Sequence, residues 1–160
     1  MISVPIDEPA VTLMREELKS VATAVRDAIA QIDAEPSRGL KTLFPAMWCE
    51  YASIVLAEVL GARGLGSWTF VEHGHFEGPN GHTWIELRDQ TGKSLWTIDV
   101  TIDQFSWGGD APFVGKERTP AAGVFTKVRF EGNWNEWPVL KWNPSYRAYL
   151  DAFAEKSGLL

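Results

Sequence analysis

The chain has 160 residues, of which 45% are hydrophobic and 22% are charged, and its formal net charge is −6. This length suits one domain with a core of its own, so we expect a single domain over residues 1–160. The negative charge argues against a protein that binds nucleic acid by neutralising phosphates and against a polybasic membrane-surface domain. Cys49 is the only cysteine, which excludes a disulfide bond within the chain.

We expect neither a membrane segment nor a secretory signal. No apolar run approaches the ~20 residues that a membrane helix needs, and the first residues lack a basic region followed by an apolar one. The expected location is therefore cytoplasmic, or outside the cell after export as an effector by a system that needs no such signal. We also expect a monomer that uses no cofactor and has neither a membrane nor a nucleic acid as partner.

Hydrophobic periodicity predicts two helices followed by strands. Apolar residues recur in steps of three and four over residues 9–34 and again over about 47–60, which is typical of packing helices. Cys49 then lies in the first turn of the second helix. Runs rich in β-forming residues predict three strands, at 67–76, 82–88 and 94–100.

Turn residues divide the second half of the chain. Glycine and proline predict a long loop over residues 101–123, and a further strand is expected at 124–130. Asn143 and Pro144 suit the start of a last helix over 144–156. Two helices, then antiparallel strands, then a C-terminal helix indicate an α+β fold in which the helices pack on the sheet.

The turn at residues 89–92 predicts a register that pairs His82 with Asp99. If these four residues close a hairpin, the numbers of paired residues add up to 181, and the two side chains point to the same face. An imidazole and a carboxylate in this position can form a hydrogen bond. Apolar residues occupy the opposite face of the two strands and are expected to be core: Ile85, Leu87, Trp96, Ile98 and Val100.

Cys49, His82 and Asp99 have the residue types that cysteine acyl-transfer chemistry requires. A thiolate at a helix N-terminus is favoured by the helix dipole, an imidazole can take the thiol proton, and a carboxylate orients the imidazole. Each residue also has a plainer interpretation. Cys49 on an apolar stripe suits a small buried hydrophobe, and a lone His–Asp pair across a hairpin suits a structural contact.

Three segments carry a resemblance to a known family. They are Phe44-Pro-Ala-Met-Trp-Cys49, Gly81-His-Thr-Trp-Ile-Glu-Leu87 and Ile98-Asp-Val-Thr-Ile-Asp-Gln-Phe105. In these segments the chain resembles small bacterial members of the transglutaminase-like branch of the papain-type cysteine enzymes. The resemblance implies a papain-like fold and an enzyme that acts on an amide bond of a protein, a peptide or a small molecule. The reaction it implies is that of a peptidase, an amidase, a protein-glutamine deamidase or a transglutaminase.

The same resemblance implies roles for individual residues. Cys49 becomes the nucleophile, His82 the general base and acid, and Asp99 the residue that orients the imidazole. We expect three tryptophans to contact the substrate: Trp48, Trp84 and Trp107. The chain departs from the family pattern at two positions, with Thr83 after the histidine and Glu50 after the cysteine, where smaller residues are usual. The Glu50 carboxylate opposes a thiolate at Cys49.

A zinc site is one alternative. His73, His75 and His82 lie within ten residues of one another, and a His-x-His pair on a strand points to one face. Cys49 or an aspartate is available as a further ligand.

A non-catalytic binding module is another alternative. Four tryptophans fall in or beside predicted loops: Trp107, Trp134, Trp137 and Trp142. Exposed aromatic residues often mark contacts with peptides or sugars, although such residues also cover small cores. Asp103 is expected to share a face with Asp99, where it either contacts the site or, with Gln104, ends the strand.

Overall fold

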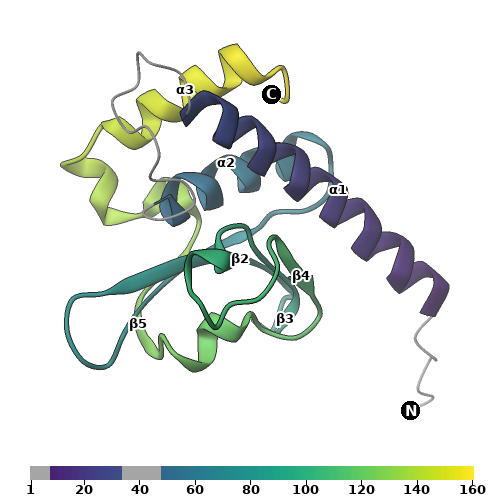
Figure 1. The fold of residues 1–160 in the computed structure, drawn as a ribbon, viewed down its shortest axis with the longest axis horizontal. Coiled ribbons are helices and arrows are strands. Elements are labelled where there is room, and N and C mark those ends of the chain that lie inside the picture. The colour runs from purple at the N-terminus through teal and green to yellow at the C-terminus, as the bar shows by residue number, and fades with distance from the viewer. Residues whose placement is uncertain (1–7, 34–47) are drawn as a thin grey trace.

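Three helices lie together on one side of a five-stranded sheet (Figure 1). The computed structural model describes residues 8–33 and 48–160. The helices are α1 (Glu8–Asp33), α2 (Cys49–Ala62) and α3 (Ser145–Ser157), close to the predicted ranges. Cys49 lies in the first turn of α2, as the sequence predicts. The helix begins at Cys49, whereas the predicted start at about residue 47 lies outside the described residues.

The sheet is antiparallel, with the strand order β4-β3-β2-β1-β5. The strands are β1 (Thr69–Gly74), β2 (Gly81–Arg88), β3 (Ser94–Asp99), β4 (Phe113–Gly115) and β5 (Lys127–Gly132). The predicted α+β class is therefore confirmed. Within the described ranges, no helix combines the length and the hydropathy that spanning a bilayer requires.

The prediction of a continuous loop over residues 101–123 is wrong, because β4 lies inside it. This strand has three residues and pairs with β3 at the edge of the sheet, from Thr97↔Gly115 to Asp99↔Phe113. Three residues are too few to show an alternating pattern, and the pairing joins segments far apart in the chain. Two short 3₁₀ helices, Ile102–Gln104 and Pro120–Gly123, occupy more of the same segment.

The predicted hairpin register is wrong by two residues. The backbone N–H of Asp89 donates to Lys93, so the loop has three residues and ends on Gly92 at φ 88°, as in a common three-residue hairpin. A bulge between Leu87 and Arg88 adds the second residue of shift, and Ile85 pairs with Ile98. Because a shift of two residues preserves the alternation of faces, the side chains from His82 to Leu87 and from Trp96 to Asp99 keep their predicted side.

The two faces of the sheet are covered by different parts of the chain. Phe70, Ile85 and Ile98 belong to a buried cluster with α1 and α2. Their neighbours on the opposite face include Val71 and Trp84, which pack in a second cluster against residues of the segment 101–126. The fold therefore has three layers: the helices, the sheet, and the segment 101–126, which covers the second face of the sheet.

The second face also buries a charged network centred on Glu86 in β2. The Glu86 side chain is 1% exposed and accepts hydrogen bonds from the Trp84 indole at 2.7 Å and from Arg88 at 2.9 and 3.1 Å. Arg118 adds a contact at 3.3 Å, and Arg88 also bonds to Glu131. Glu86 and the Trp84 indole depend on these partners, because both are buried away from water, whereas Arg88, Glu131 and Arg118 are partly exposed.

Candidate active site

The predicted hydrogen bond between His82 and Asp99 is present and completely buried. His82 Nε2 lies 2.9 Å from both carboxylate oxygens of Asp99, and neither side chain is exposed to solvent. The two residues are diagonal rather than directly opposite, a distance that an aromatic-sized side chain spans. Thr119 donates a further hydrogen bond to Asp99 Oδ2 at 2.8 Å. The carboxylate, although desolvated, is therefore satisfied on both oxygens.

Gln104 determines which nitrogen of the His82 ring carries the proton. Gln104 Nε2 lies 3.2 Å from His82 Nδ1 and 3.1 Å from Thr101 Oγ1. An amide NH₂ group only donates, so Nδ1 accepts with its lone pair and Nε2 keeps the proton that it donates to Asp99. His82 is thus held in the tautomer whose basic nitrogen points away from the carboxylate.

The Cys49 thiol lies in a different environment, at the N-terminus of α2. It donates to Glu50 Oε2 at 3.2 Å. Burial raises the pKa of the Cys49 thiol well above its ordinary value, and the Glu50 carboxylate raises it further. Hydrogen bonds from the hydroxyl and the backbone N–H of Thr83 lower this pKa, but only in part. In this arrangement the residue is a protonated thiol.

The structure does not bring Cys49 to His82. The thiol contacts Thr83, which also bonds to Ser53 of α2 and so points toward the helices. His82 precedes Thr83 in β2 and points to the opposite face, where its ring contacts Phe105 and Phe125. Among the hydrogen bonds of residues 8–33 and 48–160, none joins the thiol to the imidazole. The two groups are one residue apart along β2 but on different sides of it.

Acidic and phenolic groups surround the thiol. Burial and the nearby Glu50 raise the pKa of Glu72, while a hydrogen bond from Trp137 lowers it. Burial, together with the same carboxylates, raises the pKa of Tyr146 beyond its ordinary range. The charge that disfavours the thiolate is that of Glu50, as the glutamate at this position suggests from the sequence.

The three tryptophans expected to contact substrate have different positions. Trp48 is buried beside Cys49 and packs edge-on against Tyr149. Trp84 is fully buried and bound to Glu86, so its position does not agree with a contact to substrate. Trp107 is 45% exposed and lines a cavity of about 390 Å³ next to His82. Residues 44–47, which contribute to the family resemblance, lie outside the described residues.

The three histidines do not converge on a metal site. His73 Nδ1 bonds to the carbonyl oxygen of Phe125 at 3.0 Å, His75 bonds to Glu77, and His82 bonds to Asp99. In the part of the chain that the structure describes, no group of three or more histidine, cysteine or acidic side chains is placed to hold a metal ion. The geometry therefore gives the zinc alternative no support.

Two polar residues of the site were not predicted from the sequence. Asp103 pairs with Arg26 of α1 at 2.6 Å and does not approach His82, whereas the next residue, Gln104, bonds to the ring. The Asp-Gln-Phe segment that carries part of the family resemblance is the signal that points to Gln104. Thr119 has no comparable signal, because only the fold of the segment 101–126 places it beside Asp99.

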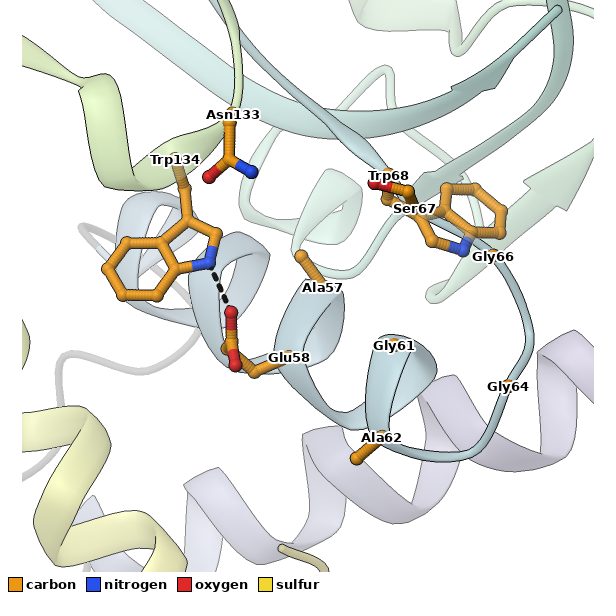
Figure 2. A pocket seen from close by; sticks show the side chains of 10 residues that line it. All are labelled: Ala57, Glu58, Gly61, Ala62, Gly64, Gly66, Ser67, Trp68, Asn133 and Trp134. Carbon is orange, nitrogen blue, oxygen red and sulfur yellow. Dashed lines mark hydrogen bonds between the residues drawn. The ribbon is translucent and has the colours of Figure 1, made fainter.

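A larger cavity lies at the other end of α2 and contains neither Cys49 nor His82. Its volume is about 560 Å³, and Figure 2 shows Glu58 and Trp134 joined by a hydrogen bond of 2.6 Å on one side of it, with Trp68 on the opposite side. Gly61, Gly64 and other small residues form much of its wall. No cysteine or histidine is among the residues that line it, so the candidate active site remains the region around β2.

Replacing Glu50 with glutamine should increase the rate of Cys49 alkylation at pH 7 by about 3- to 10-fold. The neutral amide removes a negative charge that raises the thiol pKa, so the thiolate fraction at a given pH increases. The wild-type rate should rise with pH and reach half its maximum above the ~8.5 of an ordinary thiol. Iodoacetamide labelling followed by intact-mass spectrometry gives both results. Glu58→Gln, on the same helix, is the matched control, and equal rates for the two variants would contradict the assignment.

Comparisons with protein-family models, with curated proteins and with solved structures gave no match. The chemistry of the site is therefore inferred from its own residues.

Proposed function

We propose that the protein is a cysteine-dependent acyl-transfer enzyme of the papain-like, transglutaminase-like kind that acts on an amide bond. Cys49 is the nucleophile, His82 the general base and acid, and Asp99 the orienting carboxylate. The observation that carries the proposal is the completely buried His82–Asp99 hydrogen bond, one residue along β2 from the contact between the thiol and Thr83. The nucleophile also begins a helix, where a cysteine of this chemistry is best placed.

The protonation of His82 supports a role as base. Asp99 accepts the Nε2 proton and can stabilise the imidazolium that forms when Nδ1 takes a second proton. Nδ1 is occupied only by the neutral amide of Gln104, at 3.2 Å. A buried histidine with a structural role also needs hydrogen-bond partners, but a carboxylate partner adds a negative charge that stabilises the imidazolium.

Catalysis requires two hydrogen bonds to be exchanged. The thiol leaves Glu50, Gln104 leaves Nδ1, and the start of β2 rearranges so that His82, still bonded to Asp99, and the thiol come to the same side of the strand. The described geometry is then the resting state of the enzyme, with the thiol protonated and the base occupied. Such a rearrangement suits an enzyme that forms its nucleophile only when a substrate is bound.

The reaction follows from these roles. His82 Nδ1 accepts the thiol proton, and Cys49 Sγ attacks the acyl carbon. The backbone N–H of Cys49, in the first turn of α2, is free of an intrahelical acceptor and can stabilise the oxyanion. The leaving amine takes the proton from the imidazolium, and a thioester remains. Water then gives hydrolysis or deamidation, whereas a second amine gives transfer.

The experiment that tests this proposal compares wild type and Cys49→Ala on a whole proteome. A mass increase of about one unit at glutamine identifies a deamidase, new termini identify a peptidase, and a covalent link between chains identifies a transferase. Each change should disappear in Cys49→Ala, whose fold is retained because alanine fills nearly the same buried space. A proteome unchanged by wild type, or changed equally by the variant, would contradict the proposal and favour a binding module.

A further inference from the structure

The cavity of about 390 Å³ next to His82 is built from three separated parts of the chain. One part follows β3 and contributes Gln104, Phe105 and Trp107. The second precedes β5 and contributes Phe125. The third is the connection between β1 and β2, which contributes His75 and Asn80. Its volume is within the range of cavities that bind small molecules or side chains.

Aromatic rings belong to half of the residues that line the cavity. Phe105 and Trp107 are stacked, with their centroids 4.7 Å apart and their planes at 5°. Phe125 is tilted against both of them, at 5.4 and 6.4 Å, and His75 meets Phe125 edge-on at 6.1 Å. These separations are those of favourable aromatic contacts. Trp107 is 45% exposed, so the stack is open to a further ring.

The cavity is directly connected to the candidate base. Phe105 meets the His82 ring edge-on at 4.9 Å, and Phe125 lies 5.8 Å from it. Gln104 belongs to the cavity wall and at the same time donates to His82 Nδ1. A group bound in the cavity therefore lies beside the nitrogen that must accept the thiol proton.

The charges of the cavity limit the kind of ligand that it accepts. Among the described residues that line it, none is an aspartate, a glutamate, a lysine or an arginine. A charged ligand would find no counterion there, whereas a flat neutral ring would gain contacts with the aromatic wall. The Asn80 amide and the amide oxygen of Gln104 are available to a peptide backbone at the edge, since the Gln104 NH₂ group already donates to His82 and Thr101.

We infer that this cavity is the binding site for an aromatic side chain of a peptide substrate, on the side of β2 that carries His82. The inference rests on the proposed function and specifies its substrate class: peptides that contain phenylalanine, tyrosine or tryptophan. It makes Trp107 a specificity-determining residue.

The test measures binding to Cys49→Ala, which cannot turn over a substrate. N-acetyl-L-phenylalaninamide and N-acetyl-L-leucinamide are titrated while the indole N–H signal of Trp107 is followed by NMR, assigned with Trp107→Phe. The aromatic amide should bind about 3- to 10-fold more tightly. Trp107→Ala, read through other shifted signals, should remove this preference, and Trp107→Phe should retain it. Trp142→Ala changes a tryptophan outside the cavity that is more exposed than Trp107, at 71% against 45%, and should have no effect.

Failure of this inference is distinguishable from failure of the proposed function. Equal affinities for the two amides, or a preference that survives in Trp107→Ala, would overturn the aromatic site even if wild type shows thiol-dependent turnover. Conversely, aromatic binding that depends on Trp107 supports the site even in a protein that modifies no substrate.

Discussion

Replacing Asp99 with asparagine should lower kcat/KM for the amide substrate by about 10³- to 10⁴-fold while the protein stays folded. The neutral amide cannot stabilise the imidazolium that forms on His82. Its NH₂ group also favours the tautomer that carries a proton on Nδ1, where a lone pair is needed. The asparagine side chain has the size of the aspartate that it replaces, and it keeps an oxygen that accepts the hydrogen bond from Thr119. Steady-state kinetics on the substrate found in the proteome experiment measures the loss.

The control for Asp99→Asn removes a neighbouring hydrogen bond without changing the charge. Thr119→Val should cost about 1 kcal/mol of stability and leave kcat/KM within about tenfold of wild type. The ¹⁵N chemical shifts of the His82 ring report the tautomer directly and do not depend on a substrate. If Asp99→Asn retains wild-type kcat/KM and the same ring shifts, Asp99 is a structural partner and does not orient a base.

Replacing Glu86 with alanine should destabilise the fold by about 3–5 kcal/mol, because the variant leaves buried charged and polar groups without their acceptor. The Trp84 indole and the Arg88 guanidinium lose the carboxylate, and Arg118 loses its contact. For a domain of this size the loss corresponds to a decrease in Tm of about 6–20 °C, measured by calorimetry or circular dichroism. Glu86 does not contact His82, so activity per folded molecule should change little.

Two further variants provide reference values for the loss of stability expected in Glu86→Ala. Glu86→Gln keeps an oxygen for the Trp84 indole and should be less destabilising than the alanine variant. Glu16 is exposed on α1, and Glu16→Ala should change the free energy of unfolding by no more than about 0.5 kcal/mol. If the Glu86→Ala and Glu16→Ala proteins have the same Tm, the Glu86 network makes no net contribution to the stability of the fold.

Local patterns predicted most of the elements. The periodicity of α1 is long and regular, and the alternation in β2 and β3 assigns each side chain to a face. The register could be wrong by two residues without separating His82 from Asp99, because faces repeat every second residue. The edge strand β4 could not be found in this way, since three residues have no measurable period.

The candidate site was predicted less completely, for a physical reason. Spacing along one hairpin brings His82 and Asp99 together, and it needs no knowledge of the remaining chain. The position of Cys49 depends instead on how α2 is rotated against the sheet, which the packing of Ser53 and its neighbours decides. No local rule relates the face of a helix to the face of a strand twenty or more residues away.

By itself the sequence determined the α+β class, the position of Cys49 in the first turn of α2 and the shared face of His82 and Asp99. All three follow from periodicity and strand alternation, which act over a few residues. The tertiary structure alone decided that the thiol meets Thr83 and Glu50 and that Gln104 occupies His82 Nδ1. Those contacts join segments distant in the chain, and their geometry is set by the packing of the core.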